Sequence, residues 1–142
     1  MKTLGLDVGE KRVGVALSDD SGRIAFPTTT LTGDIPLAEL IANIIALAHN
    51  HNVQRLVVGM PISLSGQAGP AAAKVAQFVA ALRSQSDLEI AVWDERLTTA
   101  QAEKAMRDDD VSPSRRRGDV DKIAAALILQ NYLDAHTDDD TN

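Results

Sequence analysis

Aliphatic residues alternate with glycines and one acid in residues 3–9. Side chains of a strand point alternately to its two faces, so one face carries three aliphatic side chains and the other carries Gly5, Asp7 and Gly9. A strand that only packs would have Val or Ile at the glycine positions. We therefore expect Asp7 on a central strand, facing a groove with room for a metal ion or a phosphate. The alternative is a strand that ends in an ordinary turn.

The rest of the chain predicts two further strands, and then helices that alternate with strands. Short turns join residues 3–9, 11–18 and 23–31, which predicts an antiparallel meander. Pro27 cannot donate a ladder hydrogen bond, so we expect the third strand at an edge. The other expected elements are a helix over 36–50 with Asp34 as its cap, a strand over 54–60, a helix over 70–85, a strand over 88–93, a helix from Thr98 to about Met106 and a helix over 119–135. Helices between strands demand parallel crossovers, so the pattern predicts an α/β fold with a mixed sheet.

Length and composition indicate a single globular domain over residues 1–135. The chain has 142 residues, 44% of them hydrophobic, and no cysteine, which fits a reducing cytoplasm. No apolar run approaches the ~20 residues that span a bilayer, so we expect no membrane partner. The net charge of −6 counts against simple polyanion binding. Residues 136–142 form an acidic tail that we expect to be disordered.

Three acids can meet at one edge of the predicted sheet. Asp7 lies in the first predicted strand, Glu95 follows the last predicted strand, and Asp121 lies in the first turn of the last predicted helix. Ligands of open α/β sheets bind beyond the carboxyl ends of the parallel strands. Carboxylates that share a cleft repel one another unless a cation holds them, and oxygen ligands without cysteine select Mg²⁺ or Mn²⁺. Two such ions ~4 Å apart can cleave a phosphodiester bond.

Basic residues surround these acids in the sequence and could hold flanking phosphates. They are Lys11, Arg12, Arg96, Arg115, Arg116 and Arg117. Each candidate also has a purely structural explanation. Asp121 could be an acid stabilised by a helix N-terminus, and Glu95 could be an ion-pair partner of Arg96. The three consecutive arginines lie in residues 107–118, which we expect to form a polar loop, and a solvated loop is their simplest role.

Blocks of sequence at residues 6–16, 93–99 and 116–125, in this order, resemble the YqgF/RuvX-like family of pre-16S rRNA nucleases, relatives of Holliday junction resolvases. A fourth block, residues 57–61 with the glycines and prolines that follow, is similar to the family's substrate-side loop. The chain differs from many relatives at Ser63, Ser65 and Ala68 in that loop, which affects substrate contacts rather than the acids. Arginines before the last acid replace the lysines of many relatives and retain the charge.

The resemblance implies an RNase H-like fold with a five-stranded mixed sheet. It implies that strands one to three are antiparallel and that strands four and five are parallel to the first. It also implies that Asp7, Glu95 and Asp121 bind Mg²⁺ or Mn²⁺ in a cytoplasmic endonuclease. The implied substrate is structured RNA, the ends of precursor 16S rRNA. Whether the protein forms a homodimer is left open.

Three other functions compete with that hypothesis. A DNA junction resolvase would use the same chemistry on branched DNA, and dimerisation would favour it because symmetric cuts need two sites. Half of an actin-like ATPase would explain the Asp7 and Gly9 block, but such proteins need a second similar domain. A non-catalytic RNA-binding assembly factor would need none of the three acids.

Overall fold

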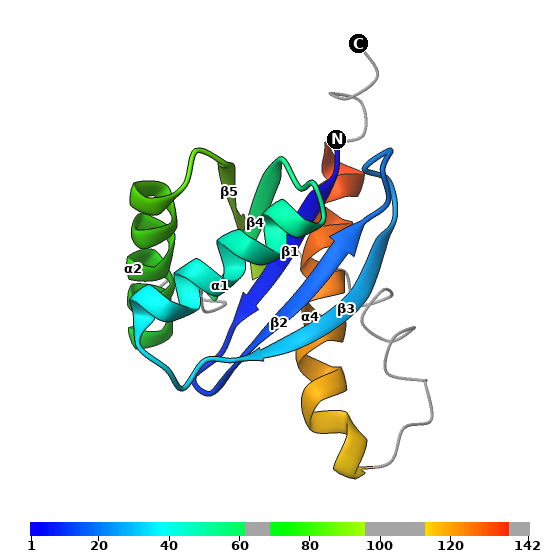
Figure 1. Ribbon diagram of the computed structural model, residues 1–142. Helices are drawn as coiled ribbons and strands as arrows, with labels where there is room; N and C mark the ends of the chain where they lie inside the picture. The colour runs from blue at the N-terminus through cyan, green and yellow to red at the C-terminus, as the bar shows by residue number, and fades with distance from the viewer. Residues whose placement is uncertain (62–68, 96–112, 137–142) are drawn as a thin grey trace.

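The computed structural model describes residues 1–61, 69–95 and 113–136. It contains a five-stranded sheet with helices on both faces (Figure 1). The strands are β1 (Thr3–Val8), β2 (Arg12–Ser18), β3 (Ala25–Thr32), β4 (Arg55–Met60) and β5 (Glu89–Asp94). The helices are α1 (Leu37–Asn50), α2 (Pro70–Gln85) and α4 (Pro113–Ala135). Arg96, the helix expected from Thr98, the loop with Ser63, Ser65 and Ala68, and residues 137–142 lie outside the described residues.

The strand order is β3-β2-β1-β4-β5, which confirms the predicted mixed sheet. β1 pairs antiparallel with β2, and β2 antiparallel with β3. β4 is parallel to both β1 and β5. β3 is an edge strand, as Pro27 requires. β1 therefore lies at the centre, where the chain switches from one side of the sheet to the other.

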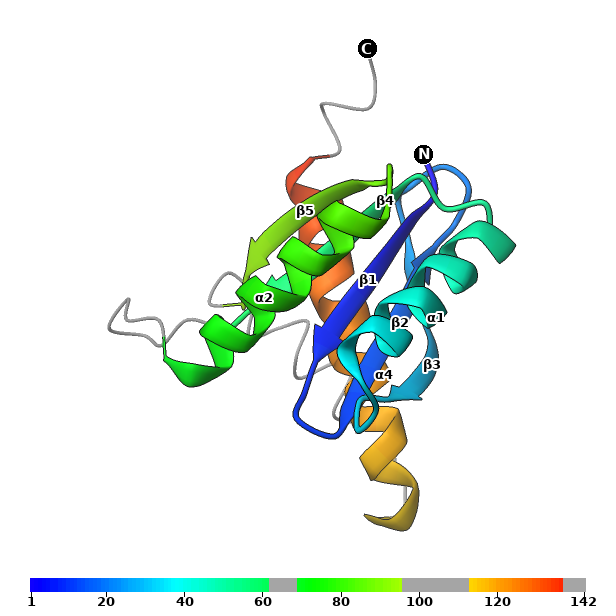
Figure 2. The same cartoon turned by 60° about the vertical axis from the view of Figure 1, so that its left-hand side comes forward.

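Two hydrophobic cores lie on opposite faces of the sheet. α1 and α2 cover one face, where aliphatic side chains of β1, β2 and β4 meet Ile41, Ile44 and Phe78. α4 covers the other face, and the two views agree that it lies behind β1 and β2 (Figure 2). The α4 core includes several alanines, such as Ala16 and Ala125, together with larger residues such as Leu129 and Tyr132. Small side chains allow this helix to lie close to the sheet.

Glycines of the strands provide the space that α4 occupies. A Cβ on Gly5 would lie 2.7 Å from Cβ of Leu129, and one on Gly59 would lie 2.6 Å from Cδ1 of Ile128. Both distances are shorter than side chains tolerate. The expectation of an open groove along this face of β1 is therefore wrong at Gly5, where α4 fills the space. Only the carboxyl end of the strand, at Asp7, is left for a site.

α4 begins at Pro113, so the expected start at Asp119 is wrong. Residues 113–118, which were expected to continue a polar loop, are helical. Proline is well tolerated in the first turn of a helix, because its missing N–H has no partner there in any case. The three arginines 115–117 consequently belong to a helix, and Asp121 lies well inside it. In Figure 1 the first part of α4, drawn in yellow, extends beyond the carboxyl end of β1.

α1 also begins differently from the prediction. Its N-cap residue is Pro36, no side chain caps it, and Asp34 lies outside the helix. None of the helices in the described parts of the chain has the length and apolar character that crossing a membrane requires.

Candidate active site

The three predicted acids come from three separate elements. Asp7 is half-buried near the carboxyl end of β1, and Glu95 directly follows the last residue of β5. Because β1, β4 and β5 are parallel, their carboxyl ends lie at the same edge of the sheet. Asp121 reaches this edge from α4, on the face of the sheet that the helix covers.

Asp7 and Glu95 interact directly. The pKa of Glu95 is raised to about 7, first by burial and then, in decreasing order, by the charge of Asp7, a hydrogen bond with Asp7 and the charge of Asp94. Burial and then the charge of Asp121 raise the pKa of Asp7, whereas its hydrogen bond with Glu95 lowers it. A hydrogen bond between two carboxyl groups requires a proton on one of them. The pair therefore holds one proton near neutral pH.

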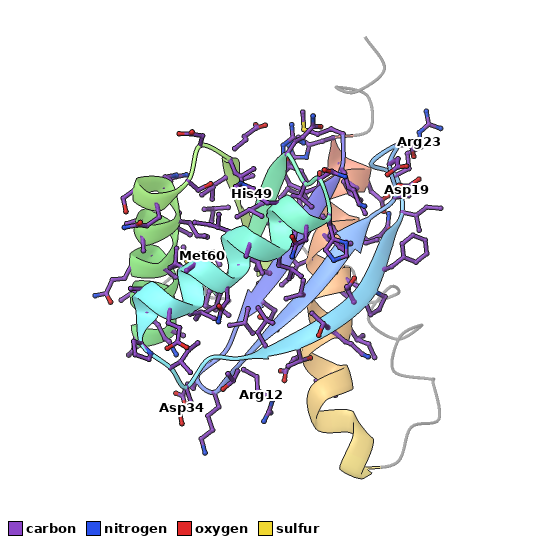
Figure 3. All side chains as sticks on the ribbon, in the orientation of Figure 1. Arg12, Asp19, Arg23, Asp34, His49 and Met60 are labelled. Atoms are coloured by element: carbon purple, nitrogen blue, oxygen red, sulfur yellow. The ribbon has the colours of Figure 1, made fainter. Side chains whose placement is uncertain are left out.

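Asp121 has a different partner. The Nε of Arg12 donates a hydrogen bond to its Oδ2 at 2.5 Å, which joins the first residue of β2 to α4. The side chain of Arg12 is 44% exposed and that of Asp121 is 21% exposed. Figure 3 shows Arg12 at the lower end of the sheet, where β1 ends. The guanidinium thus neutralises the third acid while it is still accessible to solvent.

Two glycines position the acids, and the search for chemical groups in the sequence missed both. Gly14 is paired with Asp7 in the sheet, and the carbonyl of Asp121 lies directly against the position where its Cβ would be. On β4, a Cβ on Gly59 would lie 2.8 Å from Oε1 of Glu95. Glu95 and the backbone of Asp121 therefore occupy space that these glycines leave. The available signal was a glycine in the interior of a strand, which often marks a close approach of another segment.

The described residues contain no three acids or histidines placed to hold one metal ion together. The donor chemistry nevertheless fits a hard divalent cation, because all three groups are carboxylates. Part of each raised pKa comes from the charge of a neighbouring carboxylate, that of Asp121 for Asp7 and that of Asp7 for Glu95, and such a cation would relieve this repulsion. The electrostatic environment of Asp121 is different, because the guanidinium of Arg12 already serves as its counter-ion. The geometry brings Asp7 and Glu95 together and places Asp121 beside Asp7.

The predicted basic residues are only partly placed around the acids. Lys11 and Arg12 are exposed at the turn between β1 and β2, and Arg12 contacts Asp121. Arg115, Arg116 and Arg117 lie in the first turns of α4, which also carries Asp121. Arg96 follows Glu95 outside the described residues. Lys74 of α2, which sequence reasoning did not single out, donates to the carbonyls of Gly9 and Glu10 at 3.1 and 3.3 Å.

Together the sheet order, the flanking helices and the acids at the end of β1 define an α/β protein of RNase H-like fold. The RuvC of Thermus thermophilus in complex with a Holliday junction substrate superimposes with a TM-score of 0.63. The alignment covers 96% of this chain and 97% of that chain at 15% identity, and it supports the fold. A second structure of Thermus thermophilus RuvC gives a TM-score of 0.60 at 14% identity.

Sequence comparison assigns the family. Residues 1–135 match the family model described as "RuvX: Holliday junction resolvase". A protein of Desulforudis audaxviator is 44% identical over 135 residues, which are 95% of either chain. One of Chloroflexus aggregans is 45% identical over 132 residues, 93% of this chain and 92% of its own. Both are named "Putative pre-16S rRNA nuclease". The chain belongs to the RuvX family.

Proposed function

We propose that this chain is a metal-dependent endonuclease that hydrolyses phosphodiester bonds at the ends of precursor 16S rRNA in the cytoplasm. Residues 1–135 act as one nuclease domain. The observation that carries the proposal is the electrostatic coupling of Asp7 with both Glu95 and Asp121 at the carboxyl end of β1. The names of the curated relatives support the RNA substrate.

Asp7, Glu95 and Asp121 are the proposed ligands of Mg²⁺ or Mn²⁺. Bound divalent ions would supply an activated water and charge stabilisation for the leaving oxygen. The chain's own residues must first adjust. Glu95 has to lose the proton that it shares with Asp7, and Arg12 has to leave Asp121. Once Arg12 is released from Asp121, its N–H groups can donate to a substrate phosphate instead. Asp121 is then free to bind the metal ion.

Basic side chains would bind the phosphates on either side of the cleaved bond. Lys11 and Arg12 flank Asp7 at the turn after β1, and α4 carries three arginines ahead of Asp121. Local positive charge is needed because the net charge of −6 repels a polyanion on average. The proposed substrate contacts are Lys11, Arg12, Arg96, Arg115, Arg116 and Arg117.

Cleavage of branched DNA is the second candidate function, because the description of the matching family names Holliday junction resolvases. Both reactions hydrolyse the same kind of bond, so the acids do not distinguish them. A junction resolvase would act as a homodimer with two sites, whereas trimming of RNA ends needs one.

The test incubates purified protein with precursor 16S rRNA and with a four-way DNA junction, each with Mg²⁺, with Mn²⁺ and with EDTA. We expect cleavage of the precursor near the ends of 16S rRNA, dependent on the metal and abolished in Asp7→Asn. Glu95→Gln and Asp121→Asn should abolish it as well. Preferential cleavage of the junction would establish the second candidate. Unchanged precursor cleavage in all three variants would overturn the assignment of the acids.

A further inference from the structure

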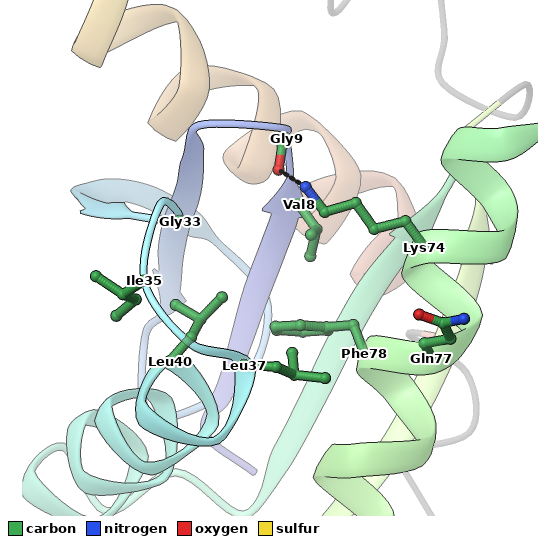
Figure 4. Close-up of a pocket in the computed structure, with 9 residues that line it drawn as sticks. All are labelled: Val8, Gly9, Gly33, Ile35, Leu37, Leu40, Lys74, Gln77 and Phe78. Atoms are coloured by element: carbon green, nitrogen blue, oxygen red, sulfur yellow. Dashed lines mark hydrogen bonds between the residues drawn. The ribbon is translucent and has the colours of Figure 1, made fainter.

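A pocket of about 190 Å³ lies on the α1 and α2 face of the sheet, beside the carboxyl end of β1 (Figure 4). Val8 and Gly9 line it, together with residues from both helices. Asp7 and Val8 are consecutive in a strand, so their side chains point to opposite faces. The acids and the pocket therefore lie on the two sides of the same strand end.

The lining of the pocket combines apolar walls with polar groups at its rim. Leu37 and Leu40 of α1 form part of the wall, and the ring of Phe78 reaches toward Leu37 from α2 (Figure 4). Lys74 and Gln77 are exposed members of the same lining. Gln77 offers an amide donor and an acceptor, and Lys74 offers an ammonium group. Apolar walls with a few such polar groups fit a small ligand that has an apolar body and polar atoms at its edge.

Lys74 connects the pocket to the predicted cleavage site. Its Nζ donates to the carbonyls of Gly9 and Glu10, which belong to the turn between β1 and β2 (Figure 4 draws the bond to Gly9). The same turn leads to Lys11 and Arg12, and Arg12 contacts Asp121. A nucleic-acid strand that crosses this turn would have its phosphates beside basic side chains, the acids on one side and the pocket on the other.

We propose that this pocket receives an unstacked nucleobase of the substrate strand, next to the phosphate that is cleaved. The proposal rests on the proposed nuclease function and adds a base-binding subsite to it. Bases that leave the stack are held by apolar and aromatic side chains and are recognised through hydrogen bonds to their edges. Extrusion of a base from a continuous duplex costs unstacking and unpairing energy, so the subsite would favour substrates that are already unpaired beside the cut.

A variant that fills the pocket tests the proposal. Leu37 is 44% exposed at the pocket, so Leu37→Trp adds bulk there without displacing a core side chain. Ala38→Trp is the matched control, because Ala38 is an exposed neighbour on α1 outside the lining. In an Asp7→Asn background, which prevents cutting, we expect Leu37→Trp to weaken binding of single-stranded RNA roughly tenfold, the effect of removing one stacked base. Ala38→Trp should bind like the parent. Equal binding by both variants would overturn the proposal.

Methyl NMR spectra give a second readout that does not depend on cleavage. Addition of single-stranded RNA, or of uridine or adenosine monophosphate, should shift the methyl signals of Val8, Ile35, Leu37 and Leu40. RNA that saturates the protein and leaves these signals unchanged would overturn the subsite. If the wild-type protein cuts no substrate, the proposed function fails, and shifted methyl signals would then leave the pocket as a base-binding site alone.

Discussion

Glu95 is the residue whose charge state is most sensitive to conditions near neutrality. Its pKa of about 7 is far above the ordinary value of 4.5, chiefly because the carboxyl is buried beside Asp7. Below pH 7 one proton reduces the repulsion within the pair, and above pH 7 both groups are charged. The same residue therefore stabilises the protein when protonated and is prepared to bind a cation when it is not.

Glu95→Gln should stabilise the folded protein at high pH. Between pH 4.5 and 7 the folded state retains a proton that the unfolded chain has released, so stability falls as the pH rises through this window. Glutamine cannot ionise and avoids that decrease. Because the carboxyl is only half-buried and water screens it, we expect a gain of about 1–2 kcal/mol in the free energy of unfolding at pH 8. Urea unfolding in EDTA measures it.

At pH 4.5 the variant and the wild type should differ little. A gain of equal size at both pH values would show that packing, rather than the charge of Glu95, is responsible.

Gly14→Ala should disrupt both the fold and the site. The added Cβ would collide with the backbone of Asp121, and backbone cannot rotate away as a side chain can. α4 would have to move outward, at a cost of about 1–3 kcal/mol, and would carry Asp121 away from Asp7. Thermal unfolding and the cleavage assay measure the two effects. Gly69→Ala is the control, since nothing lies within 4 Å of its Cβ position. A stable and active Gly14→Ala protein would contradict the close approach of α4.

At the scale of elements, the site depends on contacts between segments that are distant in sequence. Arg12 at the start of β2 is paired with Asp121 of α4 across 109 positions. The opposite end of α4 is also fixed, because Gln130 accepts from the N–H of Ala25 and donates to the carbonyl of Arg23, both at 2.9 Å. The helix is therefore anchored at two places along its length, and Arg12 is the anchor nearer the acids.

Arg12→Gln should strengthen Mn²⁺ binding and weaken RNA binding. Removal of the guanidinium takes the positive partner away from Asp121. Mn²⁺ then no longer has to compete with Arg12 for this carboxylate. Because this ion pair is partly exposed, the gain in Mn²⁺ affinity should be modest, about threefold to fivefold. Titration calorimetry measures both affinities. Arg55→Gln removes another ion pair, with Glu89 at 3.0 Å, and should leave Mn²⁺ binding unchanged. Equal affinities in both variants would show that Arg12 does not compete with the ion.

The sequence predicted the presence and type of the helices and strands better than the residues at which they begin and end. Alternation and apolar runs placed each strand that the structure describes, and α2 matches its predicted residues. The start of α4 was missed because proline and consecutive arginines resemble a loop, whereas packing of Ala125 and Leu129 on the sheet supports a long helix. Where such a helix begins depends on tertiary contacts, and local helix propensity carries no information about those contacts.

For the whole molecule, the same reasoning predicted that the three acids lie near one edge of the sheet, but not how they are arranged. Their role as metal ligands stays a prediction. Asp7 stood out because glycines flank it, and the strand order then required Glu95 to end at the same edge. The pairing of Arg12 with Asp121 could not be predicted, because it depends on where α4 crosses β2. The pocket was missed as well, since its lining comes from β1, the segment before α1, and both helices of the other face.

The distribution of charge over the molecule leads to a final prediction about RNA binding. With a net charge of −6, affinity must come from local basic groups, and the first turns of α4 carry three arginines beyond the end of β1. Replacement of Arg115, Arg116 and Arg117 by glutamine should weaken binding and flatten its dependence on salt. The slope of log affinity against log salt should fall by about one unit for each phosphate that the variant no longer binds.

Filter binding at several salt concentrations measures that slope. Arg23→Gln with Arg83→Gln is the control, because both residues are exposed and neither belongs to α4 or to the turn after β1. An unchanged slope in the triple variant would mean that these arginines are only solvated, and that Lys11 and Arg12 bind the phosphates instead. A slope that fell equally in the control would indicate that RNA responds to total charge. Only a decrease confined to the α4 variant places the substrate along the axis of this helix, on the path that leads to Asp121.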